Sequence, residues 1–403
     1  MELFWLEHKK LWRKKIVKIC VLLCFVYCVI FGSILLFQWF GFGSSDDYTS
    51  AFGNNFDGYT VIKDSQEYAL SFGGELTDET LQKIVSDYQQ MEADGMGEEL
   101  EKTDWQIVNN WLGTLYPELR DTSNYKTMIS YVDPDKLTGF YERRQQVLDE
   151  FLEVSGQVGA EKEFLHQIER KVEKPFHYEW VEGWSTLLGS MVADLGVVMA
   201  LFLGIVLSSL FAGEWHDNTS TLVLATRNGW GKIALVKILT GLAFTVELFA
   251  LLAVSSVISQ LFFMGTAGWD MPIQNIKLIA VAPMNMLQAE IYEYAFVLLG
   301  AIGFAGIVMF ISAAVKNNVL TLLLSLAVVY GPMMIAEYLP YEMQKALDLI
   351  PLVGSSTDIF RTNTFRIFGK LIWSPYLLIT IPVLIGILCM PFAIRSWSRR
   401  MKA

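Results

Sequence analysis

The stretch that decides how this chain is organised runs from Phe211 to Lys237: Phe-Ala-Gly-Glu-Trp-His-Asp-Asn-Thr-Ser-Thr-Leu-Val-Leu-Ala-Thr-Arg-Asn-Gly-Trp-Gly-Lys-Ile-Ala-Leu-Val-Lys. It is a short polar segment between two long apolar runs. Side-chain oxygens at 217–219 can accept hydrogen bonds from the free backbone N–H groups of a helix start. Gly229 and Gly231 can end a helix. The segment therefore predicts one short helix across the mouth of two membrane helices.

Two interpretations of this helix fit its residues. A capped, half-apolar helix offers a docking surface to a soluble partner. A helix in a short connector also serves simply to turn the chain around. The local sequence leaves both open.

The same segment resembles the hallmark segment of ABC-2 type permeases, the membrane subunits of many bacterial ABC exporters. In that family a pattern of Glu, Gly-Thr, small residue-Arg and Lys lies between the second and third spans. The residues in the matching places are Glu214, Thr219, Thr226, Arg227, Lys232 and Lys237. Asn218 stands where the family usually has glycine. The resemblance implies a coupling helix within 213–232 that fits a groove on a separate ATPase.

The residues that this resemblance assigns to ATPase coupling are Glu214, Asp217, Thr219, Thr226, Arg227 and Lys232. The chain itself has no phosphate-binding loop, because Gly229-Trp230-Gly231-Lys232-Ile233 lacks the spacing and the hydroxyl of that motif. We therefore expect no enzyme activity and no cofactor in this chain. ATP and Mg are expected in two copies of the partner ATPase.

Composition predicts a membrane protein. Hydrophobic residues make up 53% of the 403 residues, and the mean hydropathy is +0.37. A helix needs about 20 apolar residues to cross a bilayer. Six runs reach that length: 16–40, 186–212, 233–263, 290–315, 319–338 and 371–394. The first is too long for a signal-peptide core and lacks a small-residue cleavage site, so we expect a retained anchor.

The expected fold is an all-α polytopic membrane protein with six transmembrane helices and a mostly helical extracellular domain between the first two. Its expected parts are an amphipathic cytoplasmic connecting helix at 1–15, transmembrane helix 1 at 16–41, the extracellular domain at 42–185, transmembrane helices 2–6 within 186–403, the coupling helix at 213–232 and an extracellular re-entrant region at 339–370. The re-entrant region follows from the resemblance, because the family carries short helices there.

Basic residues predict that both termini face the cytoplasm. Those before the first span and after the last are Lys9, Lys10, Arg13, Lys14, Lys15, Lys18, Arg395, Arg399, Arg400 and Lys402. Lys and Arg gather on the cytoplasmic side of membrane proteins, and an even number of spans puts both ends on one side. We expect a multi-pass protein of the bacterial cell membrane, with membrane lipids but no nucleic acid as partners.

The first 15 residues interleave Leu, Phe and Trp with cations, which predicts an amphipathic helix in the membrane interface. The family has a similar helix that touches the ATPase. A simple topogenic anchor explains the cations equally well.

The region 42–185 is acidic, with 29 Asp and Glu against 12 Lys and Arg. We predict a short hairpin at 59–72 and a helix to Met91 that Thr77 caps. Further helices are predicted at 103–115, 134–154 and 158–174. The acidic surface fits either a solvated face or a receptor for cationic peptides.

Four carboxylates lie in or beside the predicted spans: Asp194, Glu247, Glu290 and Glu293. A charged carboxylate costs about 3 kcal/mol at the centre of a membrane helix, so such groups face protein or water. We predict pathway or gating roles for them, with Glu247, nearest the midplane of its span, as the first candidate. A neutral carboxyl hydrogen-bonded between helices is the alternative.

Cys20, Cys24 and Cys28 repeat every four residues and share one helix face. All four cysteines lie inside predicted spans, which argues against a disulfide framework. Packing of small apolar side chains is the favoured interpretation, and a metal-binding or lipidated face is the alternative.

The predicted function is therefore that of an ABC-2 permease subunit, coupling ATP hydrolysis by a separate ATPase to export. A second permease, identical or related, is expected to complete the pathway. The substrate stays open among peptide, lipid, drug and sodium. The alternative is a membrane-anchored receptor or immunity protein whose acidic outer domain binds cationic antimicrobial peptides.

Overall fold

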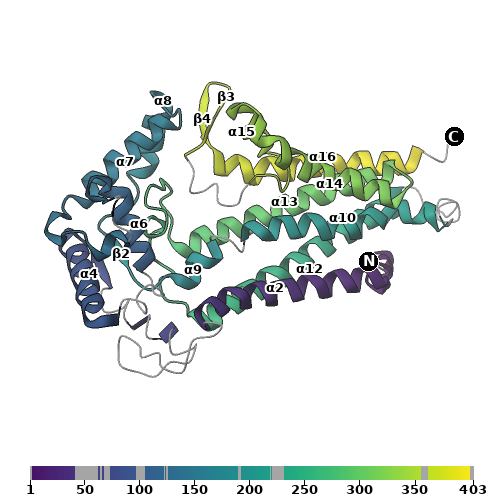
Figure 1. The fold of residues 1–403 in the computed structure, drawn as a ribbon. Coiled ribbons are helices and arrows are strands. Elements are labelled where there is room, and N and C mark those ends of the chain that lie inside the picture. The colour runs from purple at the N-terminus through teal and green to yellow at the C-terminus, as the bar shows by residue number, and fades with distance from the viewer. Residues whose placement is uncertain are drawn as a thin grey trace.

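The computed structural model describes residues 2–40, 62–63, 66–67, 73–96, 105–121, 123, 126–188, 192–217, 219, 231–354 and 362–399. The chain forms a bundle of long helices with a smaller helical domain, residues 73–181, at one end (Figure 1). We name this smaller part the head domain. The start of α12, the end of α16 and the N-terminal helix lie at the opposite end of the bundle.

In the described part of the chain, six long helices build the bundle. They are α2 (Lys15–Phe40), α10 (Val192–His216), α12 (Gly231–Met264), α13 (Met286–Ala314), α14 (Asn318–Ile335) and α16 (Ser374–Arg399). Five stretches within the described residues are long and apolar enough to cross a membrane: Leu195–His216, Gly231–Met264, Met286–Ala314, Asn318–Tyr338 and Ser374–Arg399. The chain is thus an all-α membrane protein of several spans. The remaining predicted span, which comes first along the chain, is α2, with 26 residues.

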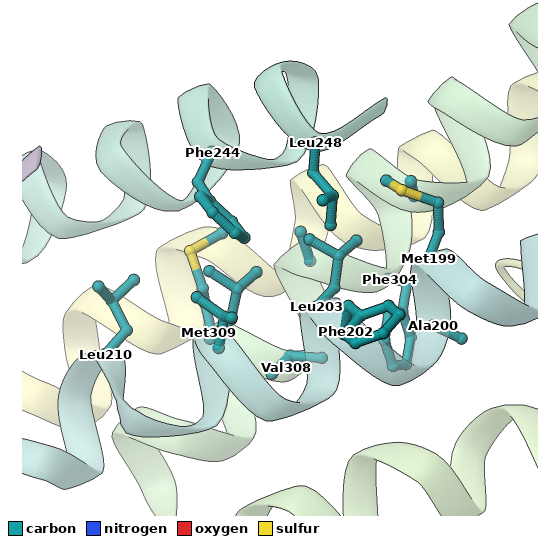
Figure 2. Packing of buried hydrophobic residues seen from close by; sticks show 14 of the residues in the cluster. Met199, Ala200, Phe202, Leu203, Leu210, Phe244, Leu248, Phe304, Val308 and Met309 are labelled. Carbon is teal, nitrogen blue, oxygen red and sulfur yellow. The ribbon is translucent and has the colours of Figure 1, made fainter. Parts of the chain in front are cut away.

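The bundle core lies where α10, α12 and α13 meet, and it consists of close-packed apolar side chains. Figure 2 shows this region, with labels on Met199, Ala200, Phe202, Leu203, Leu210, Phe244, Leu248, Phe304, Val308 and Met309. The cysteines Cys20, Cys24 and Cys28 are buried in the same cluster. Cys28 donates a weak hydrogen bond to the Leu252 carbonyl, 3.7 Å away, so this face of α2 packs on α12.

Glycines let α13 and α16 approach each other closely. A Cβ added at Gly303 would overlap the Pro382 carbonyl, and one at Gly306 would overlap the Gly386 carbonyl. Small residues permit such contact between membrane helices.

The head domain consists of short helices around an aromatic core. Its elements are β1 (Gly74–Leu76), α4 (Asp78–Met91), η1 (Glu92–Met96), α6 (Trp105–Leu115), η2 (Pro117–Leu119), η3 (Met128–Ser130), η4 (Pro134–Lys136), α7 (Phe140–Val154), α8 (Ala160–Glu169) and β2 (Phe176–Tyr178). Strands β1 and β2 pair antiparallel, with Glu75 opposite His177. Trp111 packs edge-on against Phe140 and Tyr178.

Several local predictions for this domain are confirmed, and others are wrong. Thr77 caps α4 through a hydrogen bond from the Thr80 N–H, as predicted. The helix predicted at 134–154 is instead a 3₁₀ turn followed by α7, because Gly139 adopts φ 73° and separates them. The predicted 158–174 helix ends at Glu169. Most of 59–72 lies outside the described residues, but residues 62–63 and 66–67 are helical, which contradicts a hairpin there.

Shorter elements join the long helices. They are α1 (Glu2–Arg13), α9 (Glu182–Thr186), η6 (Ile273–Asn275), η7 (Ala336–Tyr338), α15 (Tyr341–Leu347), β3 (Thr364–Ile367) and β4 (Lys370–Trp373). In the region 339–370, the described residues, 339–354 and 362–370, contain the short helix α15 and most of a β-hairpin that the sequence analysis did not predict. Arg366 of this hairpin pairs with Glu161 of the head domain.

Candidate functional site

Among the described residues, a cluster of charges around two buried side chains lies where α1 meets the end of α10 and the start of α12. Lys237 Nζ lies 2.8 Å from Glu214 Oε1 and 3.0 Å from Glu7 Oε2. Lys10 Nζ donates to the same Glu214 oxygen at 2.6 Å. Glu214 and Lys237 are only 4% and 2% exposed. We name Glu7, Lys10, Glu214 and Lys237 the ion cluster.

The amphipathic sequence of α1 positions its half of the ion cluster. Glu7 and Lys10 are three residues apart and so project from one helix face. Leu11 is buried, and Trp12 packs edge-on against Phe244 of α12, with ring centroids 5.8 Å apart. Apolar contacts therefore hold α1 on α12. Of its charged side chains, Glu7 pairs with Lys237 of α12, and Lys10 reaches Glu214 of α10.

Thr219, in the chain just beyond α10, bonds to the ion cluster. Its hydroxyl donates to Glu214 Oε2, and its backbone N–H donates to the Glu214 carbonyl at 3.0 Å. Asp217 is exposed and 3.0 Å from His216 Nδ1, and Lys232 is exposed at the start of α12. Thr226, Arg227 and most of the predicted coupling helix lie outside the described residues.

A hydroxyl from α13 joins the backbone of α10 one turn before the ion cluster. Ser312 Oγ accepts hydrogen bonds from the N–H groups of Phe211 and Ala212, each at 3.1 Å. It donates to the Ser208 carbonyl at 2.7 Å. The main chain of α10 is therefore bound to α13 in the turn before its last one.

The two lysines at the edge of the ion cluster have shifted pKa values. Burial is the largest single effect on the pKa of Lys10 and lowers it, but the hydrogen bond to Glu214 together with the negative charges of Glu214, Glu7 and Asp217 raises the pKa overall. Burial, with the charges of Lys237 and Lys10, lowers the pKa of Lys14, which donates to Ser209 Oγ at 2.9 Å. Lys10 and Lys237 thus stabilise a negative charge on Glu214, and they disfavour a third positive charge on the neighbouring Lys14.

Glu247 lies apart from the other predicted pathway carboxylates. His8 Nε2 is 2.9 Å from Glu247 Oε1, and Trp12 Nε1 donates to Glu247 Oε2 at 3.0 Å. Its side chain is 40% exposed. The structure thus brings Glu247 to the amphipathic helix α1, and its contacts with His8 and Trp12 hold α1 against α12.

Glu290 and Glu293 lie near the head-domain end of α13 and are 3% and 0% exposed. Within the described residues, no donor forms a hydrogen bond of good geometry with the carboxylate oxygens of Glu290 or Glu293. The neighbouring Tyr294 hydroxyl is 2.7 Å from Ser256 Oγ of α12. Ser256 is nine residues beyond Glu247, about 14 Å along a helix. These two carboxylates and Glu247 therefore form separate sites, and the side chain of Asp194 lies outside the described residues.

The head domain is anchored to the loop between α12 and α13. Arg144, fully buried, donates to the carbonyls of Leu278 at 2.7 Å and Ala280 at 3.2 Å, and pairs with Glu169 at 2.6 Å. Trp111 Nε1 donates to the Asn275 carbonyl at 2.9 Å. Motion of the head domain is thereby tied to the start of α13.

Sequence reasoning named Glu214 and Thr219 as site residues but missed Glu7 and Lys10 as their partners. The sequence analysis placed Lys237 in the pattern that resembles the ABC-2 hallmark but did not predict a function for it. The alternating apolar and charged residues of α1 were the available signal, but a contact over more than 200 positions has no local sequence signature.

The ion cluster joins α1, α10 and α12 through charges that no single element could bury alone, and two of its members, Glu214 and Lys237, belong to the segment 211–237. Such a joint can transmit movement between a surface segment and a helical bundle. Neither a protein-family model nor a curated protein nor a solved structure matches this chain.

Proposed function

We propose that this chain is the membrane subunit of a bacterial ABC-2 type exporter. Six spans, with α2 as the first, place both termini and the segment 211–237 in the cytoplasm and the head domain outside the cell. A separate ATPase binds the hallmark segment. Its closure on ATP moves that segment, and a pair of permeases changes between inward- and outward-facing states.

The observation that carries the proposal is the ion cluster. Glu214, Thr219 and Lys237 come from the pattern that resembles the ABC-2 hallmark, and Glu214 contacts both of the others directly. A buried charge is retained at a cost in desolvation, and its best-attested use is to fix one arrangement of elements or to switch between two. A site that receives force from a partner needs such a joint.

The proposal is tested by purifying the tagged chain from its native membrane and identifying bound proteins. We expect a P-loop ATPase to co-purify, with ATP hydrolysis in the complex. Glu214→Gln and Arg227→Ala should reduce binding of the ATPase or its stimulation by the permease. Glu150→Gln, an exposed head-domain change, is the matched control.

Two outcomes contradict the proposal. One is purification of folded protein without any ATPase. The other is unchanged coupling in both variants while their thermal midpoints match the wild type. The receptor alternative would then be favoured.

A further inference from the structure

Basic residues gather on the exposed surface where α1 ends and α2 begins. Lys9 and Arg13 lie one turn apart on α1, and Lys15 and Lys18 lie on the first turn of α2. All of them are exposed, and none forms an ion pair with another described residue. We name Lys9, Arg13, Lys15 and Lys18 the basic corner.

The exposed face of α1 carries large apolar side chains beside these cations. Trp5 and Leu6 are 62% and 64% exposed. Successive residues of a helix are turned by about 100°, so Lys9 and Arg13 project between Trp5 and Leu6, on the side away from the buried Leu11. Apolar groups interleaved with cations on an open face are typical of a helix that lies in the membrane interface.

The basic corner lies where the lipid-facing surface of the bundle begins. Among the described side chains of α2, every exposed residue beyond Lys18 is apolar; they are Ile19, Leu22, Leu23, Phe25, Val26, Val29 and Ile30. The opposite face of α2 packs on α12, a helix long enough to cross a membrane, through the contact of Cys28 with the Leu252 carbonyl. The cations are therefore at the level of the lipid headgroups.

Charge decides which occupant fits this surface. Glu2 lies on the same face of α1, about two turns before Lys9, and the cations outnumber it. A second copy of the chain, packed on this face across a two-fold axis, would bring the same cations toward one another, and like charges repel. Anionic lipids offer both the negative charge for the basic corner and acyl chains for Trp5 and Leu6.

We propose that the basic corner binds the headgroup of an anionic phospholipid of the phosphatidylglycerol class. The phosphate pairs with the cations of the corner, and Trp5 and Leu6 lie against the acyl chains. The lipid thereby holds α1 at the membrane surface, and the opposite side of α1 supplies Glu7 and Lys10 to the ion cluster. The inference involves no ATPase, so it is independent of the proposed transport function.

The test measures lipid binding to the full-length protein by native mass spectrometry. The purified protein is titrated in detergent with phosphatidylglycerol, with phosphatidylcholine of the same acyl chains, and with glycerol 3-phosphate. Each cation near an anionic surface contributes about fivefold in affinity, so phosphatidylglycerol should bind at least about tenfold more tightly than phosphatidylcholine. Glycerol 3-phosphate has the phosphate without the chains and should not displace the lipid at equal concentration.

Substitutions locate the lipid on the protein. Arg13→Gln combined with Lys15→Gln should weaken phosphatidylglycerol binding at least about tenfold and leave phosphatidylcholine binding unchanged. Arg13→Lys combined with Lys15→Arg keeps both charges and should retain binding. Arg395→Gln combined with Arg399→Gln is the matched control, because these exposed cations of α16 also have no ion pair among the described residues. The control should leave binding unchanged.

A second measurement leaves every basic residue of the corner in place. In a cysteine-free background, a nitroxide label on Leu6→Cys in phosphatidylglycerol-containing liposomes should collide more with oxygen than with a water-soluble nickel complex. The same label on Lys83→Cys, exposed on α4 of the head domain, should show the reverse preference.

Four results overturn the proposal. They are equal binding of the two lipids, displacement of the lipid by glycerol 3-phosphate, unchanged binding in Arg13→Gln with Lys15→Gln, and equal weakening by the control pair. A label on Leu6→Cys that is open to the nickel complex also overturns it, because the face would then lie in water. A label shielded from both reagents would indicate a second copy of the chain on this face instead.

Discussion

Lys237 is a lysine held almost completely inside a helical bundle. Its ammonium group has two carboxylate partners, Glu214 and Glu7, from two different helices. Removing one member of a buried ion pair leaves the others unpaired and costs about 3–5 kcal/mol. The stability of this end of the bundle therefore depends on the whole cluster.

Lys237→Met should lower the free energy of unfolding by about 3–5 kcal/mol. The thermal midpoint of the detergent-purified protein, measured by differential scanning fluorimetry, should fall accordingly. Adding Glu214→Leu should recover part of the loss, since apolar residues replace a buried pair without large cost. Lys232→Met, at an exposed position in the same helix, is the control. A Lys237→Met midpoint equal to that of the control would refute the assigned contacts.

Glu169 makes the head-domain junction sensitive to acid. Burial alone raises the pKa of Glu169, but hydrogen bonds from Lys174 and Arg144 outweigh it and hold the pKa below 4.5. Because the folded pKa is lower than the unfolded one, ionised Glu169 stabilises the fold fully above about pH 4.5. That contribution is lost as the pH falls through the folded pKa.

Thermal unfolding measured against pH checks this. The thermal midpoint of the wild type should decrease as the pH is lowered below about 4.5. Glu169→Gln should have a lower thermal midpoint than the wild type at pH 7, and its midpoint should decrease less on acidification. Glu163→Gln, which removes an exposed ion pair, should behave as wild type. An acid decline of full size in Glu169→Gln would exclude Glu169 as its source.

At the scale of elements, α13 and α16 pack with backbone against backbone. The contact at Gly306 is with main-chain atoms of Gly386, which cannot turn aside as a side chain can. Any added side-chain atom must therefore separate the helices.

Gly306→Ala should destabilise the bundle by at least about 1–3 kcal/mol, the usual cost of overpacking. Gly331→Ala in α14 is the matched control, because a Cβ there meets nothing within 4 Å. The control should be neutral or slightly stabilising, as alanine favours helix. Equal thermal midpoints for the two variants would contradict the packing of α13 on α16.

The long helices could be predicted to within about six residues, because apolar runs of membrane length have few alternative structures. The Thr77 cap could also be predicted from its local hydrogen-bond chemistry. Strands β1 and β2 could not, because each has three residues and its partner lies about 100 positions away. The break at Gly139 was hidden by Asp133-Pro134, which is a plausible helix start by itself.

The candidate site was predictable only in part, for the same reason. The hallmark pattern pointed to Glu214 and Thr219, which lie within six residues of each other. The partners on α1 depend on how that helix folds back on α12. Glu247 was predicted near the midplane of its span, and it lies at the middle of α12, but its contact with His8 had no signal in the sequence.

At the scale of the whole molecule, the two ends of the bundle should lie on opposite sides of the membrane. Phe368 at the tip of the β3–β4 hairpin is fully exposed beside the head domain, whereas Lys232 is exposed at the other end. In a cysteine-free background, Phe368→Cys should react with a membrane-impermeant maleimide on intact cells. Lys232→Cys should react only after permeabilisation. Labelling of both from one side would refute the topology.

The hydroxyl of Ser312 has a consequence for how force would travel through this protein. Because the amides of Phe211 and Ala212 bond to α13, a torque on the chain beyond His216 acts on two helices at once. The final turn of α10 would then rotate about the point where Ser312 of α13 holds the helix. Rotation of that turn would displace α13, the helix whose far end carries the loop held by the head domain.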